Sequence, residues 1–164
     1  MAQTIAAVRI DERLIHGQVA TLWQGTWRCT RIMVIDEKSA NDEVLKAVLK
    51  IACPSGVKLS VLGAEKAANN LKANKYDQDR ITIVTKTPKV ICELLDYGYQ
   101  IPSVTVGNMS GATGKKNVAK SVAVTDEDIE AFKKLQQAGV ELLYQMVPSS
   151  SPVAFMPLLE AAIK

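Results

Sequence analysis

Short runs of β-branched and apolar residues alternate along the chain with longer segments in which apolar residues recur at helical spacing. The runs predict strands over residues 5–10, 32–35, 57–62, 81–84, 103–106, 122–124 and 142–147. The run at 32–35 consists of apolar residues, which is typical of a parallel strand covered on both faces.

The intervening segments predict helices over residues 18–26, 43–52, 64–73, 89–96, 126–137 and 153–163. We expect Asn41 and Asp42 to cap the second of these helices, and residues 125–128 have the form of a capping box for the fifth. Residues 149–152 are expected to cap the last helix. The inner stripe of the second helix is expected to contain Val44, Leu45, Val48, Leu49 and Ala52.

Strands separated by helix-length segments imply right-handed crossovers and parallel pairing. The sequence therefore predicts an α/β fold of three layers, in which helices cover both faces of a mostly parallel central sheet. The short strands late in the chain favour an antiparallel edge. No linker, repeat or low-complexity tract interrupts the pattern, so residues 1–164 are expected to form a single domain.

The composition is that of a soluble globular protein, with 48% hydrophobic and 23% charged residues. The 20 basic and 17 acidic side chains are spread too evenly for nucleic-acid binding, which needs a concentrated basic surface. Aromatic residues make up only 5% of the chain, which also argues against a base-stacking platform.

No apolar run approaches the length that spans a bilayer, and the N-terminus has no basic segment or cleavage site. A cytoplasmic protein is therefore expected. Cys29, Cys53 and Cys92 are odd in number and widely spaced, which predicts small buried hydrophobic residues and argues against disulfides or zinc. With one histidine and no close pair of thiols, neither a metal nor a cofactor is expected.

The loop after the first predicted strand has an unusual composition. Residues 9–18 read RIDERLIHGQ, so two arginines and two carboxylates precede His16, the only histidine of the chain. A glycine and a predicted helix start follow directly. Because ligands of parallel α/β sheets bind outside the carboxyl ends of the strands, this loop is the candidate functional site.

These residue types fit the chemistry of phosphoryl transfer. A neutral imidazole is a nucleophile near physiological pH, and a phosphorylated imidazole carries about two negative charges. Main-chain amides at the helix start and the forked guanidinium of Arg13 are suited to stabilise that charge, and Gly17 permits close approach of the backbone. From the residues alone, a structural or surface role for His16 stays open.

Residues 8–19, VRIDERLIHGQV, resemble the phosphorylation-site motif of the IIB subunits of the mannose/fructose/sorbose family in the bacterial phosphoenolpyruvate-dependent sugar phosphotransferase system. The similarity extends through most of the chain. It continues at residues 36–42, 54–58, 106–109, 114–115 and 122–134.

The resemblance implies a phosphohistidine carrier, that is, a kinase-class transferase of the type protein-N(π)-phosphohistidine–sugar phosphotransferase. A IIA protein is expected to donate a phosphoryl group from its own histidine to His16. The carrier is then expected to pass the group to a sugar at the membrane components IIC and IID, working in the cytoplasm at the periphery of the permease. Mannose, fructose, sorbose and an amino sugar all stay open as substrates, as does association into a homo-oligomer.

The resemblance also assigns roles to residues of the loop. Three residues that match the motif around the histidine are predicted to bind phosphate: Arg13, Gly17 and Gln18. Arg9 matches as well and is predicted to bind phosphate, with a structural ion pair as the alternative. Asp11 or Asp36 is predicted to orient the imidazole, and capping of a loop is the alternative for both.

Two rival functions come from other classes. A non-catalytic regulatory or ligand-binding α/β domain that retains the IIB scaffold is the main alternative. A nucleotide-dependent kinase is rejected, because Met109 stands where a P-loop ending at Gly114-Lys115 needs glycine, and Lys116 stands where it needs serine or threonine. The loop at 107–116 departs from the Gly-Gly-Met of many family members, and its role stays open.

Trp23 and Trp27 lie one turn apart on the first predicted helix. We expect them to pack in the core or against a partner, with a sugar-stacking face as the alternative.

Overall fold

The structure is a computed structural model that describes residues 2–110 and 113–164, apart from the side chains of Gln18 and Val19. Its strands are β1 (Thr4–Asp11), β2 (Arg31–Ile35), β3 (Lys58–Leu62), β4 (Arg80–Thr85), β5 (Ser103–Asn108), β6 (Lys116–Ala119), β7 (Val122–Val124), β8 (Glu141–Tyr144) and β9 (Val153–Ala154). Its helices are α1 (Gly17–Trp27), α2 (Glu37–Ala40), α3 (Glu43–Ala52), α4 (Ala64–Lys72), α5 (Pro88–Asp96), α6 (Asp126–Gln137) and α7 (Phe155–Ala162).

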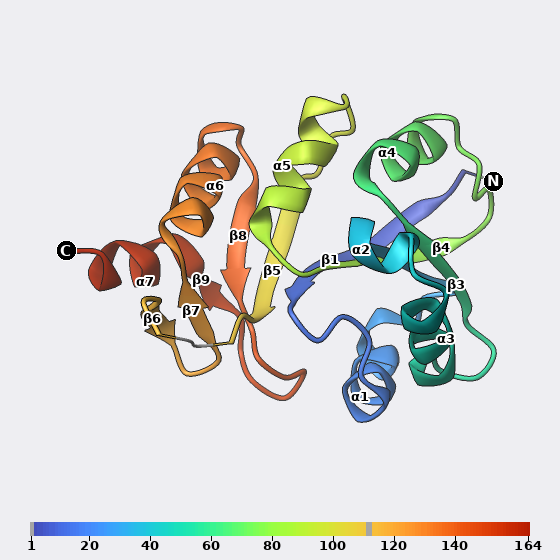
Figure 1. Ribbon diagram of the computed structural model, residues 1–164, viewed down its shortest axis with the longest axis horizontal. Helices are drawn as coiled ribbons and strands as arrows, with labels where there is room; N and C mark the ends of the chain where they lie inside the picture. Colours follow the sequence, from blue (N-terminus) through green and yellow to red (C-terminus); the bar gives the residue numbers. More distant parts are fainter. Residues whose placement is uncertain (1, 111–112) are drawn as a thin grey trace.

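The main sheet has seven strands in the order β3-β2-β4-β1-β5-β8-β9. Every pairing in it is parallel except that of β8 with β9, which forms an antiparallel edge (Figure 1). Strands β6 and β7 form a separate antiparallel pair. The predicted α/β fold with a mostly parallel sheet and an antiparallel edge is therefore confirmed.

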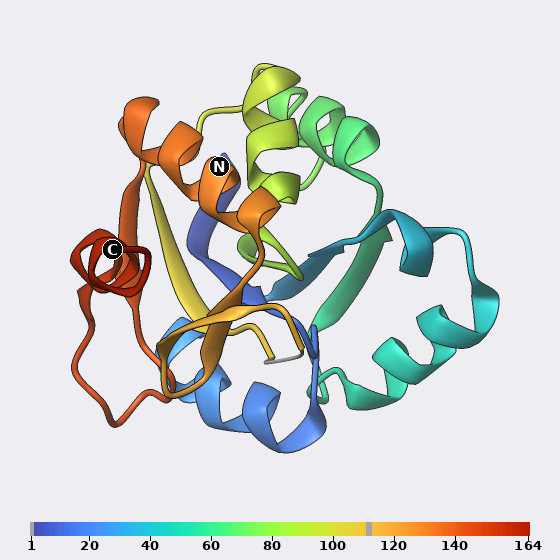
Figure 2. The same cartoon turned by 60° about the vertical axis from the view of Figure 1, so that its left-hand side comes forward.

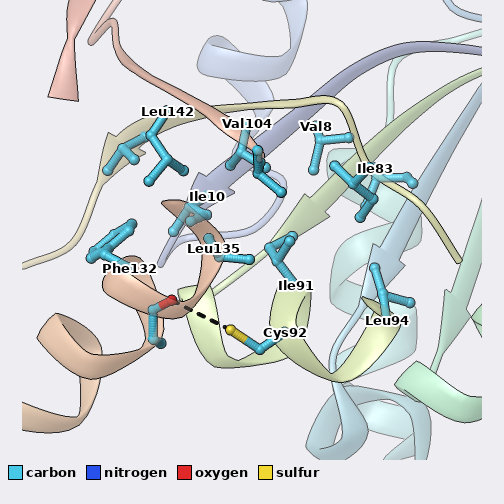
Figure 3. Packing of buried hydrophobic residues seen from close by; sticks show 14 of the residues in the cluster. Val8, Ile10, Ile83, Ile91, Cys92, Leu94, Val104, Phe132, Leu135 and Leu142 are labelled. Carbon is cyan, nitrogen blue, oxygen red and sulfur yellow. Dashed lines mark hydrogen bonds between the residues drawn. The ribbon is translucent and has the colours of Figure 1, made fainter. Parts of the chain in front are cut away.

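Helices cover both faces of the main sheet, with α1 and α3 on one side and α4, α5 and α6 on the other (Figures 1 and 2). The apolar side chains beneath them form two clusters that the sheet separates. In the larger cluster, side chains of α5 and α6 pack on those of the central strands (Figure 3). Its labelled members include Val8, Ile10, Ile83, Ile91, Leu94, Val104, Phe132 and Leu135.

The starts of α3 and α6 follow the predicted caps Asp42 and Thr125, whereas Asn41, also predicted to cap α3, lies at the end of α2 and donates its side-chain amide to the Glu37 carbonyl. The carboxylate of Asp42 accepts hydrogen bonds from the main-chain amides of Val44 and Leu45, at 2.9 and 3.2 Å. Thr125 and Asp128 exchange the two bonds of a capping box, each at 3.0 Å. Side chains with local hydrogen-bond geometry thus fix both starts, which is why the sequence predicts them.

The predicted inner stripe of α3 is wrong at two positions. Val44 and Val48 are 72% and 56% exposed, whereas Leu49 is buried. Together with the exposed Ile51, the two valines form a second apolar face, since residues three and four positions apart share one side of a helix. The helix packs on the sheet through the face that carries Leu49.

The predicted cap of the last helix is also wrong. Helix α7 begins after Ala154, whose side chain makes no capping bond, because residues 153–154 first pair with β8 as strand β9. Ser150 instead closes a turn, in which its hydroxyl donates to the carbonyl of Val147 at 2.8 Å.

The three cysteines are free thiols. Cys29 and Cys92 are buried, as predicted, and Cys53 is half-buried. Burial raises the pKa of all three thiols, so the neutral form is favoured. The Cys92 thiol donates to the main-chain carbonyl of Ala131 at 3.4 Å, which links α5 to α6 (Figure 3).

Asp79 joins three strands at the edge of the sheet where the parallel strands begin. Its carboxylate accepts hydrogen bonds from Thr30 at 2.9 Å, from Arg31 at 2.9 Å and from Lys58 at 3.2 Å. Burial by itself raises the pKa of Asp79, but these three donors outweigh burial and hold the pKa below its ordinary value.

The pH dependence of unfolding tests this network. The depressed pKa means that Asp79 stabilises the fold above its unfolded-state pKa, and that this contribution is lost as the pH falls through its folded-state pKa. We expect Asp79→Asn to lower the free energy of unfolding at neutral pH by about 1–3 kcal/mol. Urea unfolding at a series of pH values should show a smaller loss of stability on acidification for the variant than for the wild type. Equal acid sensitivity of the two proteins would contradict this assignment.

Candidate functional site

The loop from β1 to α1 lies at the edge of the sheet where the parallel strands end, and β1 is flanked there by β4 and β5. His16 is the N-cap residue of α1, with an extended backbone at φ −122° and ψ 128°. Its imidazole is exposed and makes no capping hydrogen bond. The only histidine of the chain therefore stands accessible at the edge where parallel α/β sheets bind ligands.

The start of α1 supplies main-chain donors beside His16. Amides in the first turn of a helix lack partners within that helix, and Gly17 and Gln18 occupy this turn. A Cβ at Gly17 would meet open space within the described structure, so the packing of the chain does not by itself require glycine there. The side chain of Gln18, which is predicted to bind phosphate, lies outside the described residues.

Asp11 holds Arg13 at the surface of the loop. One carboxylate oxygen of Asp11 accepts from the main-chain amide of Arg13 at 3.0 Å and from its Nε at 2.9 Å, and the other accepts from a terminal nitrogen at 2.8 Å. The Asp11 side chain is 2% exposed, whereas that of Arg13 is 40% exposed. The hydrogen bond that Arg13 donates to Asp11 raises the pKa of Arg13, which keeps the guanidinium charged. The pair thus presents a fixed, partly exposed cation.

The backbone between Arg13 and His16 is anchored in the core. Leu14 has a left-handed φ of 60°, which is uncommon for a residue with a side chain, and its amide donates to the Asp11 carbonyl at 2.9 Å. Leu14 and Ile15 are each 7% exposed and belong to the apolar cluster beneath α1. Burial of these two side chains compensates the strained turn and fixes where His16 emerges.

Arg9 lies beneath the loop and not on its surface. Its side chain is 2% exposed, and its terminal nitrogens donate to the main-chain carbonyls of Gln145 at 2.8 Å and Met146 at 3.0 Å. Its Nε is 3.5 Å from the carboxylate of Asp11. Burial lowers the pKa of Arg9, although Asp11 opposes this effect. These contacts favour the ion-pair alternative over direct contact with phosphate.

Asp36 caps a different helix. Its carboxylate accepts from the amide and the hydroxyl of Ser39 at 3.2 and 2.6 Å, at the start of α2. Asp11 is occupied by Arg9 and Arg13. For both aspartates, the arrangement agrees with the structural alternative that the sequence left open.

The loop after β5 is joined to the site through Glu12, a residue that the motif did not single out. The Glu12 amide donates to the Asn108 carbonyl at 2.9 Å, and its carboxylate accepts from the amide of Ser110. The bond from Ser110 is the main cause that lowers the pKa of Glu12. Burial opposes this effect, and the charges of Lys115 and Lys86 make smaller contributions that lower the pKa further. These lysines add positive charge near the loop. Sequence pattern gave no signal for this contact, because its partners are nearly a hundred residues apart.

The tryptophans of α1 belong to the core. Trp23 and Trp27 are 4% and 7% exposed and stack with ring centroids 5.5 Å apart. The guanidinium of Arg9 lies 4.5 Å from the ring centroid of Trp23. The expected packing role is confirmed, and neither ring forms an open sugar-binding face.

The fold is that of phosphotransferase-system IIB components. The crystal structure of the IIBSor domain of the sorbose permease from Klebsiella pneumoniae matches with a TM-score of 0.91 and 32% identity, over 96% of this chain and 97% of that one. The model of the family described as "PTS system sorbose subfamily IIB component" matches residues 5–164, so the chain belongs to this family. The resemblance predicted from the motif is thereby confirmed.

Curated relatives agree with this assignment. The sorbose-specific EIIB component of Klebsiella pneumoniae is 34% identical over 149 residues, which cover 91% of each chain. The mannose-specific EIIAB component of Escherichia coli K12 is 37% identical over 155 residues, which cover 94% of this chain and 48% of that relative. The chain therefore spans about half of the EIIAB protein. IIB components are phosphotransferases of the sugar phosphotransferase system, and this chain is one of them.

Among the described residues, no helix has both the length and the apolar character needed to cross a membrane.

Proposed function

We propose that the protein carries a phosphoryl group on His16, which it accepts from a phosphohistidine of a IIA protein and transfers to a sugar at the membrane components IIC and IID. The observation that carries this proposal is the position of His16. It is the only histidine of the chain, exposed at the start of α1, with the cation of Arg13 three residues before it. The setting is suited to a nucleophile that must meet two successive partners.

In the first step, a ring nitrogen of His16 attacks the phosphorus of the donor's phosphohistidine. The new P–N bond forms as the donor's P–N bond breaks. The donor imidazole takes up a proton, and His16 gives up the proton of its other ring nitrogen, so charge and atoms balance. This step needs an accessible imidazole nitrogen, which the exposed His16 provides.

In the second step, a sugar hydroxyl attacks the phosphorus on His16. The O–P bond forms, the P–N bond of His16 breaks, and the proton lost by the hydroxyl balances the proton that the imidazole regains. Between the steps, the phosphoryl group carries about two negative charges. We propose that the amides of Gly17 and Gln18 and the guanidinium of Arg13 stabilise these charges, so that catalysis rests on positioning and electrostatics.

A IIA donor is supported by the EIIAB relative, whose name joins the two components in one protein. This chain matches about half of that protein. Relatives named for sorbose and for mannose are of comparable identity, so the sugar is left open among the substrates of this family. We propose that the carrier works in the cytoplasm, where it docks transiently on the permease.

Phosphoryl transfer from a panel of donors tests the proposal. The purified protein is mixed with IIA domains of the mannose, fructose and sorbose systems that were phosphorylated beforehand. We expect an acid-labile phosphate on this chain with at least one donor, and mass spectrometry of its peptides should assign the phosphate to His16. No label with any donor, or a label on another residue, would overturn the proposal.

A further inference from the structure

Arg9 connects the site loop to a distant part of the chain. Both terminal nitrogens of its guanidinium donate to successive main-chain carbonyls, those of Gln145 and Met146, in the segment that follows β8. Figure 1 shows this segment and the loop from β1 to α1 at the same side of the molecule. A planar guanidinium whose two terminal nitrogens donate to two carbonyls has a fixed orientation. A lysine ammonium does not reproduce this geometry.

The walls around the Arg9 guanidinium leave it little room to move. On one side is the indole of Trp23, whose ring centroid lies 4.5 Å from the Cζ atom of Arg9. On another side stands Gly107 of β5, where a Cβ would overlap the guanidinium. Gly107 has an ordinary backbone conformation, so its lack of a side chain is what the packing of Arg9 requires. The position of Arg9 is thus set by β5, α1 and the segment after β8 together.

The fixed guanidinium in turn holds Asp11. A carboxylate in the interior needs charge compensation, because burial takes it out of water. Arg9 Nε and a terminal nitrogen of Arg13 approach the same oxygen of Asp11, at 3.5 and 2.8 Å, while the other oxygen binds the amide and the Nε of Arg13. Asp11 therefore stands between a buried arginine and an exposed one.

We propose that Arg9 is a positioning residue for phosphoryl transfer: it fixes Asp11, which holds the guanidinium of Arg13 on the loop that carries His16. The expected effect of Arg9 on the rate of phosphoryl transfer rests on the proposed function. Its expected effect on the position of Arg13 rests on the contacts alone. This role differs from the expectation that Arg9 binds phosphate, because both terminal nitrogens already have carbonyl partners and the side chain is 2% exposed.

A double-mutant cycle separates the two roles, since residues that act through one another are not additive. We expect Arg9→Lys to lower the maximum rate of phosphoryl transfer from phosphorylated IIA by about tenfold to a hundredfold. The donor concentration at half-maximal rate should stay the same. In a background that carries Arg13→Ala, the same substitution should change the rate by less than about twofold. Additive effects would show that Arg9 acts on phosphate directly and would overturn the proposal.

A second variant tests whether the loss of rate in Arg9→Lys comes from displacement of Arg9 or from unfolding. Gly107→Ala keeps every charge of the site and displaces only the Arg9 guanidinium, so it should reproduce the loss of rate and the dependence on Arg13. Full activity of this variant with a displaced Arg9 guanidinium would overturn the proposal. Unfolding of both Gly107→Ala and Arg9→Lys would overturn it as well, since Arg9 would then serve the stability of the whole domain.

An NMR measurement needs no phosphoryl transfer and so distinguishes failure of this inference from failure of the proposed function. In the wild type, the Nε–H of Arg13 is held by Asp11 at 2.9 Å and should exchange slowly with water. In folded Arg9→Lys and Gly107→Ala, this signal should shift and exchange faster. An unchanged Arg13 signal in both variants would overturn the inference even if His16 is phosphorylated.

Discussion

His16→Ala is expected to lower phosphorylation by a phosphorylated IIA donor at least about 10³-fold, to below detection. Alanine has no nitrogen to form the P–N bond, and the chain has no second histidine to replace it. The measurement is the incorporation of acid-labile phosphate with time, under conditions in which the wild type is fully labelled.

The fold of this variant should be unchanged. The His16 side chain is exposed and makes no capping bond, so its removal is expected to alter the free energy of unfolding by no more than about 0.5 kcal/mol. Thr26→Ala, at an exposed position near the other end of α1, is the matched control and should be labelled like the wild type. Normal labelling of His16→Ala would refute the carrier function, and unfolding of the variant would refute the structural account of His16.

Local sequence signals predicted most of the fold. The strand at 32–35, the cap at Asp42 and the capping box at Thr125 each depend on neighbours within a few residues, and the structure contains all three. The position of His16 between a strand end and a helix start is local in the same way. Such features are determined by local propensity and capping geometry, which agree here with the global fold.

Features that depend on distant parts of the chain were not predictable in this way. Helix α3 has apolar residues on two faces, and only contact with the sheet selects the face of Leu49 over that of Val48. The burial of Arg9 depends on Gly107 and on the carbonyls of Gln145 and Met146, and these two carbonyls lie 136 and 137 residues away along the chain. The motif indicates that Arg9 belongs to the site, but the residues that bury Arg9 and bind its guanidinium lie outside the motif.

Arg13→Ala is expected to slow phosphoryl transfer by about 10²–10³-fold, the usual cost of losing one positioned donor that stabilises charge in the transition state. Arg13 is the partly exposed cation of the loop, three residues before His16, and Asp11 holds it through both carboxylate oxygens. The measurement is the single-turnover rate of transfer from phosphorylated IIA. Arg28→Ala, which makes the same change in charge at the far end of α1, should transfer at nearly the wild-type rate.

Arg13→Lys distinguishes charge from geometry at this position. Lysine retains the positive charge but replaces the planar fork by a single mobile ammonium, so it cannot satisfy both oxygens of Asp11 as Arg13 does. If the fixed geometry matters, the transfer rate of the lysine variant should lie between those of the alanine variant and the wild type. Its affinity for the donor should be unchanged. Because we propose that His16 both accepts and donates the phosphoryl group, the rate deficit should appear in both half-reactions. A wild-type rate for Arg13→Ala in both directions would remove Arg13 from the site and leave the amides at the start of α1 as the stabilising groups.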